Sequence, residues 1–229
     1  MRYYPIYVNL RGKRCLVVGA GQVGRRKIAT LAECGAEEIL VIDLAATEAC
    51  AELLSHPAVV FACRPYETAD LDGRFLVIAS TDDEALNWRI SRECAERGIP
   101  CNIVDQPEKC SFIVPALFTQ GDLTVAISTG GGSPALARKI RQGLGEFLGS
   151  EYGALLLLMS QLRPLVMGLD LGTPANSALF RDLVNSPLLE ALEQGDAARA
   201  EAILRDILPA SLHGEAAGLV SGALTHAGA

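Results

Sequence analysis

Five short apolar runs recur along the first 105 residues, with turn or helix signals between them. The runs are Cys15–Val18, Ile39–Ile42, Val59–Cys63, Phe75–Ala79 and Cys101–Val104. Continuous apolar runs are typical of parallel strands whose two faces are both covered by helices. The helices predicted between them are Val23–Cys34, Glu48–Ser55 and Asp83–Arg97. The alternation predicts a doubly wound parallel sheet in an α/β domain.

The helix predicted over Asp83–Arg97 has signals at both ends. Thr81 or Asp82 can cap its start, because side-chain oxygens accept hydrogen bonds from the free N–H groups of a first turn. Gly98 can end it, because glycine adopts the left-handed conformation that follows many helices.

The pattern changes after the fifth run. Leu123–Ser128 alternates apolar with smaller or polar residues, which predicts a strand with one buried face. A glycine run follows, and Ser133 as N-cap with Pro134 at the first helical position predicts a helix to about Phe147. A second subunit could cover this half-buried strand. Alternatively, the strand could be a sixth one at the edge of the parallel sheet, and the sequence leaves both possibilities open.

Beyond Glu151 the strand signals disappear. Leu- and Ala-rich helical segments follow at Tyr152–Val166, Asn176–Val184, Pro187–Glu193 and Ala197–Leu208. Their apolar stripes predict a small all-helical domain. The tail from His213, rich in Gly and Ala, is expected to fray.

Composition narrows the classes of function. Half of the 229 residues are apolar, so the chain can bury a substantial core. The net charge of −7 argues against a nucleic-acid partner, because such binding depends on neutralising phosphates. A local basic cluster could still bind an anionic small molecule.

The cysteines and apolar runs indicate a compartment. All seven cysteines lie between Cys15 and Cys110 without CxxC spacing, a poor framework for disulfides or zinc, so we expect no metal site. No signal peptide is visible, and the longest apolar run, Ala154–Met159, is too short to span a bilayer. We expect a cytoplasmic protein with no membrane partner.

The turn after the first predicted strand carries a dinucleotide pattern. Gly19 permits the sharp turn, Gly21 lets backbone approach a pyrophosphate, and Gly24 lets the helix pack against the strand. With Asp43 about 20 residues on, at the tip of the second strand, the context predicts a Rossmann-like domain. The alternative is an empty turn with Asp43 as a helix cap. Asp43 would accept hydrogen bonds from the ribose hydroxyls, which favours NAD over its 2′-phosphorylated relative.

Asp105 ends the fifth predicted strand, where a carboxylate would face the nicotinamide half of the crevice. Partial desolvation by Ile103 and Val104 would make it a better proton acceptor. The alternative is an Asx-type turn near Pro107. Position alone does not separate the two.

The segment Ser128–Arg141 is a candidate anion site. Glycines before a helix N-terminus can bind anions, and Arg138, Lys139 and Arg141 place three positive charges within one turn. The alternative is an ordinary solvated helix face.

Six motifs occur in order along the chain. They are Pro5-Ile6-Tyr7 with Leu10, the loop GAGQVGRRK, Thr81-Asp82-Asp83 with Asn87, CNIVDQP, Ser111–Pro115, and SxGGGSPxLARxIR over Ser128–Arg141. Over residues 1–150 the chain resembles the precorrin-2 dehydrogenase family, the NAD-dependent portion of sirohaem synthase. The helical remainder fits that family in type.

The resemblance implies NAD-dependent oxidation of precorrin-2 to sirohydrochlorin by a homodimer, with Asp105 as the catalytic carboxylate. It implies cofactor contacts at Gln22, Val23, Asp43 and Leu44, and we add Gly19, Gly21, Gly24 and Thr81 to them. It also implies a tetrapyrrole site at Ser128 and the helix that carries Arg138, Lys139 and Arg141. Some family members also insert iron into sirohydrochlorin, and nothing here decides that activity.

The expected division is an NAD-binding domain over 1–113, a dimerisation and substrate-binding region over 114–150, and a helical domain over 151–229. A different class of function would be an NAD(H)-sensing regulatory module that binds the nucleotide without turnover. The glycine loop and Asp43 suit both classes, whereas CNIVDQP and the basic helix favour the enzyme.

Overall fold

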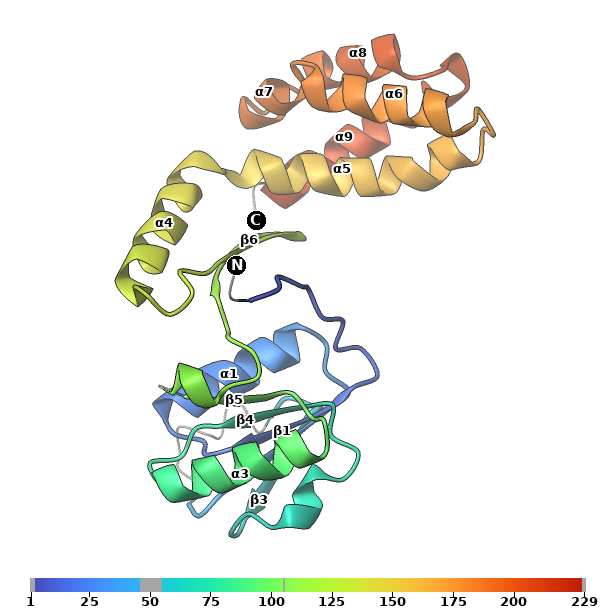
Figure 1. Ribbon diagram of the computed structural model, residues 1–229. Helices are drawn as coiled ribbons and strands as arrows, with labels where there is room; N and C mark the ends of the chain where they lie inside the picture. The colour runs from blue at the N-terminus through green and yellow to red at the C-terminus, as the bar shows by residue number, and fades with distance from the viewer. Residues whose placement is uncertain (1–2, 46–54, 105, 228–229) are drawn as a thin grey trace. The chain divides into compact units, whose positions relative to one another are not determined.

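The computed structural model describes residues 3–45, 55–104 and 106–227. The chain separates into two compact units, residues 1–114 and 115–229 (Figure 1). The helix predicted over Glu48–Ser55 lies almost wholly outside the described residues. Residues 115–229 form one compact unit. The predicted boundary between a dimerisation and substrate-binding region and a helical domain therefore stays a prediction about function.

The first unit is built on a five-stranded parallel sheet. Its strands are β1 (Arg14–Val18), β2 (Glu38–Asp43), β3 (Val59–Cys63), β4 (Leu76–Ala79) and β5 (Cys101–Ile103), and its helices include α1 (Gln22–Glu33), α3 (Glu84–Glu96) and the short η2 (Thr68–Leu71) and η3 (Pro107–Lys109). The strand order is β3-β2-β1-β4-β5, so the chain reverses direction across the sheet between β1 and β4. The predicted doubly wound parallel sheet is confirmed.

Helices cover both faces of this sheet, as the continuous apolar runs predicted. Alternate residues of β1 point to opposite faces, so Val17 packs with Ile28 of α1, whereas Leu16 packs with Ile90 of α3. Figure 1 shows α1 and α3 on opposite sides of the strands. Burial on both faces explains why the central strands β1 and β4 lack an alternating pattern, whereas the edge strand β3 is only partly buried.

The start of α3 differs from the prediction. Asp83 is the N-cap, and its Oδ1 accepts the N–H of Leu86 at 3.0 Å. Thr81 and Asp82 were the wrong candidates, because the Thr81 hydroxyl donates to the side chain of Asn87, and Asp83 accepts the backbone N–H of the first turn. Gly98 follows the helix with φ 68, the left-handed conformation predicted for its end.

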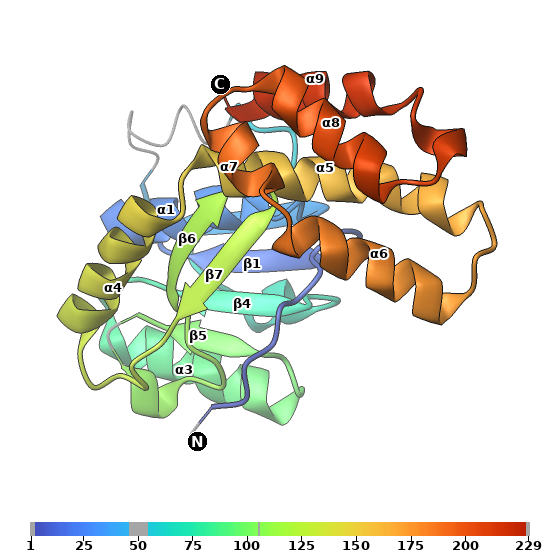
Figure 2. The same cartoon turned by 90° about the horizontal axis from the view of Figure 1, so that it is seen from above.

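The second unit begins with a separate hairpin. Strands β6 (Ala116–Gln120) and β7 (Leu123–Ile127) pair antiparallel and form their own two-stranded sheet, visible side by side in Figure 2. The sixth-strand alternative for Leu123–Ser128 is therefore wrong. Strand β6 was not predicted at all. Helix α4 (Pro134–Phe147) follows, and the predicted cap is confirmed because Ser133 Oγ accepts the N–H of Leu136 at 3.2 Å.

The rest of the second unit is helical, as predicted. Its elements are α5 (Ser150–Met167), α6 (Thr173–Asn185), α7 (Leu188–Glu193), α8 (Ala197–Ile207), η4 (Ala210–Leu212) and α9 (Ala216–Ala227). The expectation that the tail frays is wrong. Ala216, Val220 and Ala223 of α9 are fully buried or nearly so, in the same core as Leu158 of α5. Small side chains let α9 lie close to α5, so its Gly- and Ala-rich composition marks close packing.

No helix in the described parts of the chain combines the length and apolar character needed to cross a bilayer.

Candidate functional site

The turn between β1 and α1 is shaped by two of its glycines. Gly19 has φ 97, and a Cβ placed there would lie 2.6 Å from the carbonyl oxygen of Ser80. A Cβ on Gly24 would overlap the carbonyl oxygen of Gly19. Both positions therefore require glycine for the protein's own packing.

Gly21 differs from its neighbours, because a Cβ there would have no heavy atom within 4 Å. It is the N-cap of α1 and offers no side-chain acceptor to the first turn. The N–H groups of a first turn have no partner within the helix, and they carry the positive end of its dipole. Glycine at this position keeps the approach to those groups open, which suits a phosphate.

Asp43 connects the tip of β2 to the same turn. Its Oδ2 accepts the N–H of Ala20 at 2.6 Å, and its Oδ1 accepts the N–H of Ala45 at 3.0 Å. A carboxylate has about four acceptor positions, so two remain for hydroxyl groups of a ligand. Leu44, the next residue, is 73% exposed. The structure thus places the predicted ribose acceptor in contact with the glycine turn.

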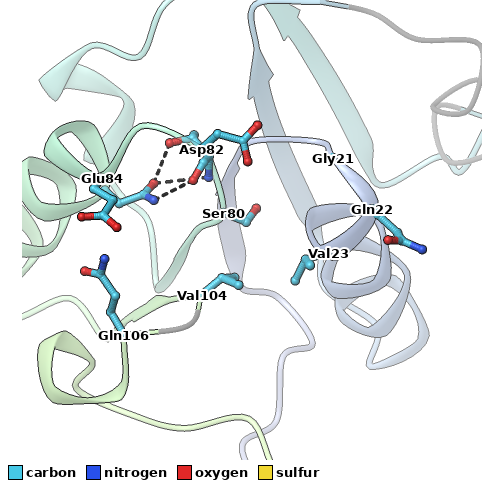
Figure 3. Close-up of a pocket in the computed structure, with 10 residues that line it drawn as sticks. Gly21, Gln22, Val23, Ser80, Asp82, Glu84, Val104 and Gln106 are labelled. Carbon is cyan, nitrogen blue, oxygen red and sulfur yellow. Dashed lines mark hydrogen bonds between the residues drawn. The ribbon is translucent and has the colours of Figure 1, made fainter.

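A pocket of about 400 Å³ opens at the carboxyl ends of β1, β4 and β5 (Figure 3). Its lining residues are Gly21, Gln22, Val23, Ser80, Thr81, Asp82, Glu84, Asn87, Val104 and Gln106. Four predicted cofactor residues, Gly21, Gln22, Val23 and Thr81, therefore share one pocket. Ligands of open α/β sheets bind at this edge, where the strand order reverses.

Hydrogen bonds hold one wall of this pocket in place. The Thr81 hydroxyl donates to Asn87 Oδ1 at 2.8 Å, and Asn87 Nδ2 donates to the Thr81 carbonyl at 2.8 Å. Asn87 is buried, and Ser80 Oγ donates to the Gly19 carbonyl at 2.8 Å. The end of β4 is thereby fixed to both α3 and the glycine turn. Sequence reasoning assigned no role to Ser80, and it quoted Asn87 only as part of a motif.

The end of β5 forms another wall. Asp105, the predicted catalytic carboxylate, lies outside the described residues, whereas its neighbours Val104 and Gln106 both line the pocket. Cys110 Sγ accepts the N–H of Ile103 at 3.1 Å and lies 3.2 Å from the carbonyl oxygen of Gln106, to which it donates. Burial raises the pKa of the Cys110 thiol, which therefore acts here as a neutral hydrogen-bonding group.

Basic residues follow the glycine turn on α1. Burial, with a smaller contribution from the nearby Arg26, lowers the pKa of Lys27 from its ordinary value. A partly desolvated cation one turn beyond the phosphate approach adds positive potential to this end of the helix.

The predicted substrate residues lie in the second unit. Ser128, Arg138, Lys139 and Arg141 are all exposed. Ser128 Oγ accepts the N–H of Gly130 at 3.1 Å in the turn that leads to α4. Gly130 and Gly131 have φ 63 and 88, so this turn needs glycine. Ser128 precedes α4 and the three cations lie within the helix, while the pocket belongs to the first unit.

Two family models match adjacent parts of the chain. Residues 6–116 match the model described as "Putative NAD(P)-binding", and residues 120–145 match "Sirohaem biosynthesis protein central". The first unit is therefore a dinucleotide-binding domain of the Rossmann type, and the predicted dinucleotide cofactor is supported.

Siroheme synthases are similar to the chain over most of its length. A siroheme synthase of Thioalkalivibrio sulfidiphilus is 39% identical over 87% of this chain and 41% of its own length. A siroheme synthase of Pseudomonas fluorescens is 39% identical over 94% of this chain and 46% of its own length. The chain thus spans less than half the length of these relatives. Over that part of their length it is a relative of the siroheme synthases, as its motifs indicated.

A solved structure has the same fold. The structure titled "SirC, precorrin-2 dehydrogenase" matches with a TM-score of 0.74 at 22% identity, over 90% of this chain and 98% of that one. The match confirms the predicted sheet domain followed by a helical region.

Replacing Asp43 by alanine tests the choice of cofactor. We expect NAD affinity to fall roughly tenfold to a hundredfold, because hydrogen bonds to a charged acceptor contribute about 1.5–3 kcal/mol. Affinity for NADP should fall less or rise, since a carboxylate no longer repels the 2′-phosphate. Calorimetric titration with both cofactors measures this. Asp72→Ala, which removes a carboxylate paired with Arg97 at the amino end of β4, is the matched control. Equal losses for NAD and NADP would contradict the assignment.

Proposed function

We propose that this chain is an NAD-dependent dehydrogenase that oxidises precorrin-2 to sirohydrochlorin in the biosynthesis of sirohaem and related tetrapyrroles. The observation that carries the proposal is the pocket itself. It runs from the open backbone at Gly21 to Val104 and Gln106, the residues on either side of Asp105. The cofactor approach and the two chain neighbours of Asp105 thus border the same space.

The residues present fit the cofactor. Gly21 leaves its backbone open, the first turn of α1 offers free N–H groups, and Asp43 keeps acceptor capacity beside the turn. Bound NAD supplies the hydride acceptor, which is the chemistry of the cofactor itself. The protein has to hold the nicotinamide ring of NAD in one orientation and prevent other orientations. Val23 and Val104 give the pocket apolar surface against which a flat ring can lie.

Oxidation of precorrin-2 removes a hydride and a proton from the substrate. Bound NAD would accept the hydride, so the chain has to provide or position an acceptor for the proton. We assign that role to Asp105, because its chain neighbours Val104 and Gln106 both line the pocket.

The substrate carries eight carboxylates, and the chain as a whole is acidic, so binding needs a local cluster of cations. Arg138, Lys139 and Arg141 provide exposed positive charges on α4, and Ser128 adds a hydroxyl at the preceding turn. Arginine pairs with carboxylates through two parallel hydrogen bonds, which favours this polyanion. We assign these four residues to the tetrapyrrole site.

A second copy of the chain is the partner we propose for the hairpin and α4. Leu136, Ile140 and Phe147 are exposed, with Phe147 at 71%, and helical periodicity places them on one side of α4. Arg138 and Arg141 lie on the other side of the helix. An apolar stripe that is exposed in one chain supports a homodimer in which the stripe is covered and the cations stay free.

The cysteines support a reducing compartment. Cys15, Cys94 and Cys101 are buried free thiols. Thiols persist in the cytoplasm, whereas oxidising compartments favour disulfides. We place the reaction in the cytoplasm on that ground.

Purified protein incubated with precorrin-2 and NAD is expected to form sirohydrochlorin, followed by its absorbance, together with NADH. A sensor without catalysis would bind NAD and leave precorrin-2 unchanged. A calorimetric titration of NAD on the same sample separates that outcome from a preparation that has lost its fold. Added ferrous iron with sirohydrochlorin, compared with the spontaneous rate, decides whether the chain also inserts iron.

A further inference from the structure

Gln106 has an amide oxygen whose hydrogen-bonding capacity is unmet. Its Oε1 is buried and has no partner among the residues that the structure describes. A buried acceptor without a donor is costly, so such atoms usually mark the place of a ligand or an ordered water. Gln106 lines the pocket, so a ligand in the pocket can reach it.

The backbone that carries this side chain is held firmly. The Gln106 carbonyl accepts the N–H of Lys109 at 3.0 Å and the Cys110 thiol at 3.2 Å. The Lys109 carbonyl in turn accepts the Ser91 hydroxyl of α3 at 2.9 Å. A side chain on such a support binds a ligand without first ordering its own backbone.

The position of Gln106 identifies which half of the cofactor it meets. Asp43 at the tip of β2 marks the adenosine side, and Gly21 marks the pyrophosphate. Gln106 follows β5, on the other side of the sheet's reversal point between β1 and β4. A dinucleotide that lies across this crevice therefore brings its nicotinamide ring to β4 and β5.

The surrounding charges decide what kind of group the amide oxygen receives. Asp82 and Glu84 line the same pocket, and none of the lining residues that the structure describes is basic. In Figure 3 the side chains of Gln106 and Glu84 point toward one another. A group placed there meets acceptors, so it has to bring N–H donors, and a carboxylate of the substrate would be repelled.

We propose that Gln106 binds the carboxamide of the nicotinamide ring, with its Oε1 accepting an N–H of the carboxamide. This inference rests on the proposed NAD-dependent function and adds a positioning residue to it. The contact fixes the rotation of the ring about its glycosidic bond, and so decides which ring face is presented to the substrate. Gln106 touches no reacting atom.

The test compares NAD with its 3-acetylpyridine analogue, in which a methyl group replaces the carboxamide nitrogen. One hydrogen bond contributes about 0.5–1.5 kcal/mol, so the wild-type chain should bind NAD roughly three- to tenfold more tightly than the analogue in a calorimetric titration. In Gln106→Met this preference should fall to about onefold. In Gln106→Glu, which keeps an acceptor, the preference should persist.

Gln22→Met is the matched control, because Gln22 lines the same pocket at the pyrophosphate end. It is expected to weaken both dinucleotides equally and leave the ratio at its wild-type value. A Gln106→Met variant that keeps the wild-type ratio would overturn the inference while leaving the NAD site intact, as would a wild-type chain that does not distinguish the two ligands. Failure of the wild-type chain to bind either dinucleotide would overturn the proposed function as well.

Discussion

Asp105→Asn is expected to lower the turnover of precorrin-2 by roughly 10²–10⁴-fold, the usual contribution of a positioned proton acceptor. Asparagine keeps the size of the side chain but cannot take up a proton at neutral pH. The affinity for NAD should stay within about twofold, because the pyrophosphate and ribose contacts lie at Gly21 and Asp43. Steady-state rates give the first quantity, and calorimetric titration gives the second.

Asp82→Asn is the matched control for this change, because Asp82 lines the pocket from the end of β4 and also loses only its charge. We expect its turnover to fall by less than about tenfold, since removing a nearby charge alters the local potential without removing the proton acceptor. Unchanged turnover in Asp105→Asn would remove Asp105 from the catalytic role, whatever the result for Asp82.

Gly24→Ala should abolish tight NAD binding and also destabilise the chain. The added Cβ overlaps the carbonyl oxygen of Gly19 and lies 2.8 Å from Ser80 Oγ, so α1 has to move away from the end of β1. Forcing extra atoms into a packed region typically costs about 1–3 kcal/mol in the free energy of unfolding. The shift also displaces the first-turn N–H groups from the phosphate position. Denaturant unfolding and NAD titration measure the two effects.

Gly21→Ala separates binding from folding. A Cβ at Gly21 has open space around it, so the free energy of unfolding should stay within about 0.5 kcal/mol of wild type. NAD affinity should nevertheless fall more than about tenfold, because the methyl group occupies the approach of the pyrophosphate. If Gly21→Ala bound NAD as tightly as wild type, the glycine turn would not be the phosphate site.

The fold of the first unit could be predicted because its signals are local. The central strand β1 contains the continuous apolar run Cys15–Val18, and burial on both faces requires that pattern. The helix at the end of the chain could not be predicted in this way. Ala216 and Ala223 are core residues of α9, but alanine and glycine carry little apolar signal, and the identity of their partner helix depends on tertiary packing.

The candidate site was predictable where one segment carries the whole motif. Gly19, Gly21 and Gly24 lie in one short segment, from the turn after β1 into the start of α1, so their spacing predicts their geometry. Gln106 and Asn87 could not be assigned in this way, because their place in the pocket depends on which strand ends and helix starts meet in three dimensions. The N-cap of α3 could not be predicted for the same reason. The sequence pattern allows Thr81 as the cap, but in the folded chain its hydroxyl donates a hydrogen bond to Asn87 Oδ1.

The proposed NAD-dependent dehydrogenation is tested most directly by the stoichiometry of the reaction with wild-type protein. Precorrin-2 and NAD are mixed with the enzyme under anaerobic conditions, and NADH and sirohydrochlorin are quantified together over time. We expect the two products to appear at the same rate, one NADH for each sirohydrochlorin, because a single hydride passes to the cofactor. NAD that binds tightly without forming either product would contradict the proposed dehydrogenation.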